Sequence, residues 1–151
     1  MKNDVVPVQI RGILPANSGC ALFVGNDAKV FVINVEPAMG QIINMFLSNA
    51  QKERPLTHDL IANILKGFNI TVERVVITEL KNSTYYARLI LQQQNEVARK
   101  LVEIDARPSD CLAIASAQKR PIYVSAPLFE QVEDMTSVLD RINENGGEVE
   151  E

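Results

Sequence analysis

The sequence predicts an α+β domain in which helices cover a mainly antiparallel, mixed sheet. Strand-like alternation fills the first third of the chain, helical spacing fills the middle, and two long strand patterns joined by a short turn follow. The chain has 151 residues, 46% hydrophobic and 23% charged, which fits one globular domain. No internal repeat or linker divides it. We therefore expect a single domain over residues 1–145 and a flexible acidic tail over 146–151.

Three strands are expected in the first third of the chain. Apolar and polar residues alternate there with a period of two, and the runs are separated by turn-forming residues. Short turns between successive strands predict an antiparallel meander. The expected strands are 6–12, 21–24 and 30–35, with turns at 15–19 and 25–27.

Two helices are expected in the middle of the chain. Pro37 suits a first helical turn, and apolar residues then recur at helical spacing to about residue 50. Thr57 is expected to cap the second helix. The apolar stripe of that helix consists of Leu60, Ile61, Ile64, Leu65 and Phe68.

The second half of the chain combines strands with a buried helix. The strand patterns 70–80 and 84–92 are joined by only three residues, which forces a hairpin. The segment 96–103 fits either a strand or a short helix. Pro108 opens a helix that is small or apolar nearly all round up to about Lys119, so this helix is expected to lie buried on the sheet. The remaining expected elements are a short strand at 121–124 and one or two amphipathic helices within 127–145.

The charge distribution excludes a protein that coats nucleic acid non-specifically. The net charge of −4 equals the contribution of Glu144, Glu148, Glu150 and Glu151, so the rest of the chain is neutral. Strong non-specific binding of nucleic acid requires an excess of Lys and Arg. The neutral body is compatible with transient binding at a local patch, as a hydrolase requires.

Cysteine content and hydropathy favour a cytoplasmic protein. Cys20 and Cys111 fall in apolar runs and are expected to be buried free thiols. The first residues lead straight into a strand pattern, so no secretory leader is expected, and no apolar run is long enough to span a membrane.

Two short polar stretches carry the residues with chemical potential. The first is Arg54-Pro55-Leu56-Thr57-His58-Asp59, which places the only histidine beside a carboxylate at a helix start. The second is Asp105-Ala106-Arg107-Pro108-Ser109-Asp110, which places two carboxylates, an arginine and a hydroxyl at another helix start. Helix N-termini attract anions through free N–H groups and the helix dipole. We therefore expect His58, Asp105 and Arg107 in one cleft.

These residue types fit metal-assisted hydrolysis of a phosphodiester. Carboxylates suit Mg²⁺ or Mn²⁺, an arginine fork clamps phosphate, and histidine moves protons near neutral pH. The expected roles are catalytic for His58, Asp59 and Arg107, metal binding for Asp105 and Asp110, and substrate binding for Arg54 and Ser109.

Structural roles account for the same residues. Thr57 and Asp59 can simply cap a helix, and Asp105 can pin a loop by pairing with Arg107. Asp110 in a first helical turn is favourable without any ligand, and a lone histidine is more often structural than catalytic. Both explanations stay open at the level of sequence.

At these stretches the sequence resembles the bifunctional nuclease domain family, over roughly residues 5–125. The resemblance implies a nuclease (DNase and RNase) fold and activity. The matching segments are 54–60, Thr84-Tyr85-Tyr86-Ala87, 104–110 and Pro121-Ile122-Tyr123-Val124. The motif positions that the resemblance identifies are His58, Asp59, Asp105, Arg107, Ser109 and Asp110.

One position departs from the pattern of that family. The family commonly has a glutamate followed by a small residue at the start of the helix after the third strand. Aligning the small residue with Gly40 puts Met39 in place of the glutamate, and Glu36 lies about one helical turn earlier. Two functions therefore stay open. One is a metal-assisted nuclease, and the other is a non-catalytic binding or regulatory module that retains an anion- or partner-binding pocket.

The long strands 70–80 and 84–92 also suggest self-association. Long strand edges pair with other chains unless they are covered. We expect a homo-oligomer, most simply a two-fold dimer.

Overall fold

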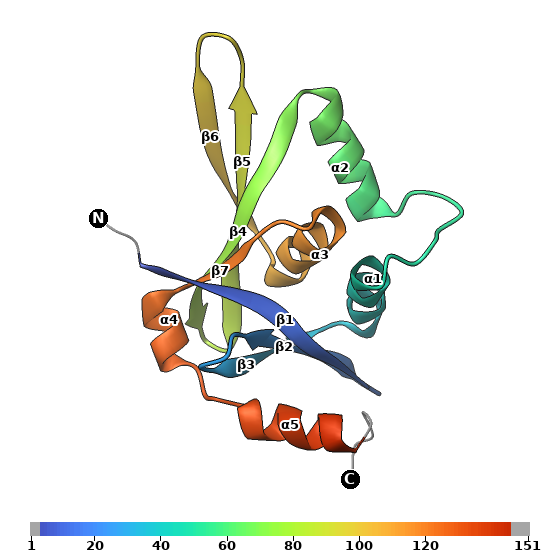
Figure 1. Ribbon diagram of the computed structural model, residues 1–151, viewed down its shortest axis with the longest axis vertical. Helices are drawn as coiled ribbons and strands as arrows, with labels where there is room; N and C mark the ends of the chain where they lie inside the picture. Colours follow the sequence, from blue (N-terminus) through green and yellow to red (C-terminus); the bar gives the residue numbers. More distant parts are fainter. Residues whose placement is uncertain (1–3, 146–151) are drawn as a thin grey trace.

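The computed structural model describes residues 4–145 and contains one seven-stranded sheet in the order β3-β2-β1-β7-β4-β5-β6 (Figure 1). Strands β4 and β7 are parallel, and every other neighbouring pair is antiparallel. The predicted α+β class and the mainly antiparallel, mixed sheet are confirmed. The elements are β1 (Val5–Ala16), β2 (Gly19–Gly25), β3 (Val30–Val35), α1 (Pro37–Leu47), α2 (Thr57–Gly67), β4 (Ile70–Lys81), β5 (Thr84–Gln94), β6 (Arg99–Ala106), α3 (Pro108–Gln118), β7 (Ile122–Ser125), α4 (Ala126–Gln131) and α5 (Thr136–Glu144).

Strand β1 joins the two halves of the sheet. Its first residues pair with β7, and its later residues pair with β2. The register with β2 shifts between Ile10 and Gly12, and such irregularities increase the local bend of a strand. In Figure 1 the meander β1–β3 consequently crosses the long hairpin of β4 and β5 at a steep angle.

Several element boundaries differ from the sequence expectation. Helix α1 ends at Leu47, because Asn49 adopts a left-handed conformation with φ 55° that stops the helix. The segment expected as strand or helix forms strand β6, which pairs with β5 over its whole length. The last part of the chain forms two helices, α4 and α5.

Helices α1, α2 and α3 share one face of the sheet, and α5 lies on the other face of the β1–β3 meander. Leu22 and Val24 of β2 pack in the same core as Ile43 of α1, whereas Phe23 packs against Leu139 of α5. Successive strand residues point to opposite faces, so these contacts place α1 and α5 on opposite sides. Helix α3 is the most enclosed, with every residue from Cys111 to Ser116 buried as predicted.

The apolar stripe expected on α2 is only partly covered. Ile61 and Leu65 pack against the core. Leu60, Ile64 and Phe68 remain 54%, 51% and 69% exposed. The helix touches α3 and β4 along a narrow face, which is too narrow to cover the full stripe. The outward part of α2 is therefore an apolar surface.

Two expectations concern the ends of the chain and the membrane. The acidic tail expected over 146–151 lies outside the described residues. Among the helices of the described part, none is both long enough and apolar enough to cross a membrane.

Candidate functional site

Helices α1, α2 and α3 bring their first turns together at one place. Glu36 directly precedes α1, and Arg107 directly precedes α3; their side chains meet with Nη1 of Arg107 3.3 Å from Oε1 of Glu36. His58 in the first turn of α2 lies with its Nε2 2.9 Å from Oδ1 of Asp110 in the first turn of α3. The N-termini of α1 and α3 therefore meet at one place, which favours anions there, and His58 links the first turn of α2 to Asp110.

Asp110 is the centre of this cluster. Its Oδ1 contacts His58, and its Oδ2 accepts a hydrogen bond of 3.0 Å from Nε of Arg107. Burial alone raises the pKa of Asp110, but hydrogen bonds from Arg107 and His58 and their charges outweigh it and hold the pKa below its ordinary value. Asp110 is consequently a carboxylate at neutral pH, and it can only accept hydrogen bonds.

His58 is a positioning residue in this arrangement. Because Asp110 is ionised, Nε2 of His58 must be the donor in their hydrogen bond. The histidine is 5% exposed, and its Nδ1 is buried without a hydrogen-bond partner among the described residues. The ring packs edge-on against Phe46 with centroids 6.3 Å apart. His58 therefore holds Asp110 in place by a hydrogen bond and is itself largely buried.

The lowered pKa of Asp110 predicts an acid-dependent contribution to stability. A depressed pKa stabilises the fold above the pKa of the unfolded chain, and this stabilisation is lost as pH falls through the folded value. Asp110→Asn should therefore lower the melting temperature at pH 7, and its difference from wild type should shrink as pH falls to about 3. Thermal melts of both proteins across this range measure the effect. Asp27→Asn at a fully exposed site is the control, and an equal pH dependence in both variants would contradict the prediction.

A cleft of about 710 Å³ opens beside the cluster. Among its lining residues Arg107 is the only basic one and Glu36 the only acidic one, and Ser109 adds a hydroxyl. The hydrogen bond to Asp110 and the charge of Asp110 raise the pKa of Arg107 above its ordinary value, with a smaller contribution from Glu36. The cleft thus presents a permanently charged guanidinium, a carboxylate and a hydroxyl to anything that enters.

Glu36 reaches the cluster, whereas Met39 does not. Met39 is 8% exposed and packs in the core beneath α1. Glu36 occupies the N-cap position of α1, and its side chain is 71% exposed.

Tyr85 is a cleft residue that the motif analysis did not assign to the site. Its hydroxyl donates to the carbonyl of Val32 at 3.3 Å, and its ring lies 5.9 Å from that of Phe31. Burial raises the pKa of Tyr85. Its neighbour Tyr86 is 40% exposed, whereas Tyr85 is partly buried and packs against the core.

Asp59 and Arg54 line a different cleft. Oδ2 of Asp59 accepts a hydrogen bond of 2.8 Å from the backbone N–H of Leu56 and lies 3.7 Å from Nζ of Lys52. Helix α2 begins at Thr57 with Leu56 as the N-cap residue, so the expectation that Thr57 caps it is wrong; the cap contact comes from Asp59. Neither Asp59 nor Arg54 lines the cleft of Arg107.

Asp105 forms no hydrogen bond or ion pair with the helix cluster among the described residues, although burial and, with it, the charge of Asp105 raise the pKa of the Cys111 thiol of α3. It lies in β6 directly opposite Arg88 of β5. Successive side chains of a strand point to opposite faces of the sheet. Val102 and Ala106 pack against the helix-covered core, so the alternation places Asp105 on the other face. Among the described residues Arg107 pairs with Asp110 and Glu36 instead of Asp105. The structure thus brings His58 and Arg107 together around Asp110 but leaves Asp105 apart.

The donor groups do not fit the expected metal site in this arrangement. Within residues 4–145, no group of three or more His, Cys, Asp and Glu side chains is placed to hold a metal ion. Both carboxylate oxygens of Asp110 already have protein partners, and Asp105 lies on the opposite face.

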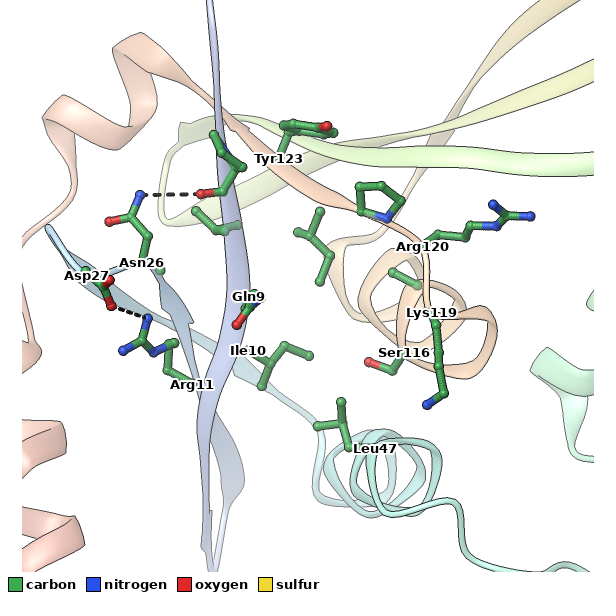
Figure 2. A pocket seen from close by; sticks show the side chains of 16 residues that line it. Gln9, Ile10, Arg11, Asn26, Asp27, Leu47, Ser116, Lys119, Arg120 and Tyr123 are labelled. Carbon is green, nitrogen blue, oxygen red and sulfur yellow. Dashed lines mark hydrogen bonds and ion pairs between the residues drawn. The ribbon is translucent and has the colours of Figure 1, made fainter.

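A second large cavity lies at the other ends of α1 and α3 (Figure 2). It measures about 720 Å³, and Leu47, Ser116 and Lys119 line one side of it. Lys119 donates to the side chain of Asn49 at 3.3 Å. Basic residues at helix C-termini are favoured by the helix dipole without any ligand. None of the site residues expected from the sequence lines this cavity, so the cleft of Arg107 remains the candidate site.

Comparison with known proteins identifies the family. A model of the bifunctional nuclease domain matches residues 22–136, which include all three helix starts. The chain is 37% identical over 129 residues to an uncharacterised protein of Mycobacterium tuberculosis, covering 85% of this chain and 74% of the relative. It is 32% identical over 102 residues to bifunctional nuclease 1 of Oryza sativa subsp. indica, covering 67% of this chain and 30% of the relative. Bifunctional nuclease 1 of Arabidopsis thaliana is 30% identical over 79 residues, covering 52% of this chain and 24% of the relative. The chain therefore belongs to the bifunctional nuclease domain family.

Proposed function

We propose that this protein hydrolyses phosphodiester bonds of DNA or RNA in the cleft lined by Arg107, Glu36 and Ser109. The observation that carries the proposal is the pairing of one guanidinium with one carboxylate where the N-termini of α1 and α3 meet. Membership of a nuclease domain family and the plant relatives named bifunctional nuclease support the same substrate class.

The roles follow from the charges that hydrolysis develops. Arg107 binds two phosphate oxygens through its planar fork and stabilises the extra negative charge of the transition state. Glu36 accepts the proton of the attacking water, because its exposed carboxylate lies within reach of the same phosphate. Ser109 donates a hydrogen bond to a phosphate oxygen, and the leaving oxygen takes a proton from solvent. Nucleic acid binding is transient, since a single cation in the cleft contributes little salt-dependent affinity.

His58 and Asp110 support this chemistry from behind the cleft. Asp110 fixes Nε of Arg107, and His58 fixes Asp110 from the opposite side. Holding a guanidinium in one orientation lowers the entropy lost when it binds phosphate. The catalytic role expected for His58 becomes a positioning role in the proposal. Assistance by Mg²⁺ or Mn²⁺ through Asp105 and Asp110 stays a prediction.

Removal of the Glu36 charge tests the proposal. Glu36→Gln keeps the size of the side chain but removes the base, and we expect cleavage of single-stranded DNA and RNA to fall about 100-fold. The melting temperature should stay nearly unchanged, because the side chain is 71% exposed. Glu53→Gln, at the cleft of Asp59 and Arg54, is the matched control and should retain wild-type activity.

Two further arms separate the mechanism from artefacts. Cleavage that survives Glu36→Gln unchanged would contradict the proposed base. Cleavage that EDTA abolishes and Mn²⁺ restores would require a metal, and loss of activity in Asp105→Asn without loss of stability would then assign Asp105 to it. Equal trace cleavage in wild type and all variants would identify a contaminant.

The alternative function is a non-catalytic binding or regulatory module. The specific observation in its favour is that Met39, at the position of the family glutamate, is buried in the core and carries no ionisable group. In that case the cleft of Arg107 binds an oligonucleotide without turnover. Fluorescence anisotropy with an intact labelled oligonucleotide distinguishes the two functions. The binding module is supported if wild type binds the oligonucleotide without cleaving it and Arg107→Ala abolishes that binding.

We also propose that the protein acts in the cytoplasm and self-associates, most simply as a two-fold dimer. The unpaired thiols of Cys20 and Cys111 are buried, which suits a reducing compartment. The roles of Arg107, Glu36 and Ser109 lie within one chain and do not depend on the assembly.

A further inference from the structure

The two edges of the sheet differ in how they are protected. Strand β3 at one edge is covered, because the N–H of Met135 donates to Val30 at 2.6 Å and the hydroxyl of Tyr85 donates to Val32 at 3.3 Å. Strand β6 at the other edge has eight residues and pairs with β5 alone among the described elements. A long uncovered edge offers a row of backbone donors and acceptors to another strand.

Most of the exposed apolar side chains in the described part lie on α2 and on the β5–β6 hairpin. Of the nine large exposed hydrophobic residues in the described part, six belong to α2, β5, β6 or the turn before β6, and Phe68 directly follows α2. On β6 itself, Leu101 is 50% exposed and Ile104 is 40% exposed. Figure 1 shows the free end of the β5–β6 hairpin extending beyond the body of the protein. A strand of a partner can therefore approach the free edge of β6 without meeting another described element of the chain that carries β6.

The charges along β6 are complementary to the same strand run in the opposite direction. The strand begins with Arg99 and Lys100 and carries Glu103 and Asp105 in its second half. Side by side in a parallel arrangement, like charges would face each other. In an antiparallel arrangement the basic half of one strand faces the acidic half of the other, which is the favourable case for cross-strand pairs.

We infer that β6 pairs antiparallel with β6 of a second copy of this chain, joining two sheets into one. This specifies the surface behind the proposed self-association, and it does not depend on the proposed hydrolysis. A two-fold axis perpendicular to the sheet leaves each side chain on the face it occupies in its own chain. Residues directly opposite each other must therefore be separated by an even number of positions, and the axis passes beside one residue that faces its own copy.

The pairing is centred on Leu101. This register places Leu101 against its own copy and Arg99 against Glu103 of the second copy, twice. These three residues share the face opposite Val102, which packs against the core. Within its own chain Arg99 reaches across β5, to Gln92 of β5 and Glu73 of β4, so association exchanges these contacts for Glu103 of the second copy. Centring on Glu103 would instead oppose two glutamates.

Charge reversal at β6 tests this surface. Sedimentation velocity of wild type over a micromolar concentration series should show a species of twice the chain mass of 16.8 kDa. The acidic variant R99E/K100E and the basic variant E103K/D105K should each sediment as monomers, and an equimolar mixture should dimerise again. The control R120E/R141E changes net charge as much as the acidic variant does at exposed sites outside β6, and it should remain dimeric.

The possible results distinguish a wrong choice of surface from an absence of self-association. A monomeric wild type at every concentration overturns both the self-association and the surface. A dimeric wild type whose association survives both reversals, or variants that do not associate when mixed, overturn the surface alone. Neither result bears on hydrolysis, which is measured on the same samples.

Cross-linking tests the register and covers the case of variants that fail to fold. In the proposed register, residue 101 lies about 5 Å from its copy, whereas residue 104 lies six residues, about 20 Å, from its copy. A short bis-maleimide should therefore link L101C into dimers and leave I104C unlinked. The two native cysteines are buried and give little background. Equal linking of both variants, or none in L101C, overturns the register.

Discussion

Replacing Arg107 with alanine is expected to lower the rate of phosphodiester cleavage about 1,000-fold, the largest effect of any single change in the cleft. Arg107 is the only basic residue lining the cleft, so no neighbouring cation can take over the charge of the transition state. The side chain is 62% exposed but also binds Asp110, so its loss should lower the melting temperature no more than Asp110→Asn does, and cleavage is measured well below both melting temperatures. Steady-state kinetics on a labelled oligonucleotide measure the effect.

Two controls make this result specific to the guanidinium. Arg54→Ala removes an equal charge at a separate cleft and should reduce cleavage less than tenfold. Arg107→Lys retains the charge but loses the planar fork, and its activity should lie between those of wild type and the alanine variant. An alanine variant with wild-type kinetics would remove Arg107 from the mechanism and, with it, the proposed function.

Replacing Gly40 with alanine is expected to destabilise the protein by about 2 kcal/mol. A Cβ at Gly40 would overlap Sγ of Cys20 and lie 2.6 Å from its Cβ, inside a packed core. Such overpacking costs about 3 kcal/mol, and the better helix propensity of alanine offsets about 1 kcal/mol. Chemical denaturation of wild type and variant measures the difference, and the melting temperature should fall by about 6 °C.

A double-mutant cycle with Cys20 identifies the cause. Cys20→Gly removes both atoms that the new methyl group meets, so Gly40→Ala should cost much less in that background. Gly67→Ala near the end of α2 is the matched control, since a Cβ there meets no atom within 4 Å. Equal destabilisation at Gly40 and Gly67, or no coupling with Cys20, would show that the contact with Cys20 is not responsible.

The fold could be predicted further than the site because its main signals are local. Strand alternation in β1–β3, the short turn between β4 and β5 and the apolar composition of α3 each depend on a few neighbouring residues. The left-handed Asn49 that ends α1 early has no equally strong local signal, because asparagine occurs both inside and after helices. The exposed stripe of α2 depends on how much of the sheet remains to be covered, which is a property of the whole fold.

The site required long-range information that spacing alone does not hold. The sequence placed His58 and Arg107 at helix starts, and the structure brings both to Asp110. The direction of Asp105 follows from the register of β6, which the pattern 96–103 left open between strand and helix. Glu36 joins the cluster only because α1 and α3 pack side by side with their first turns together.

The prolines that open α1 and α3 have a consequence for the rigidity of the cleft. Pro37 follows Glu36 and Pro108 follows Arg107, so each charged residue has its backbone confined to extended conformations, with ψ 149° and 145° in the folded protein. This confinement already acts in the unfolded chain, and folding therefore costs the pair less conformational entropy than it would cost two residues without prolines after them. Pro37 and Pro108, which carry no reactive group, thus restrict the backbone of Glu36 and Arg107 before the cleft has formed.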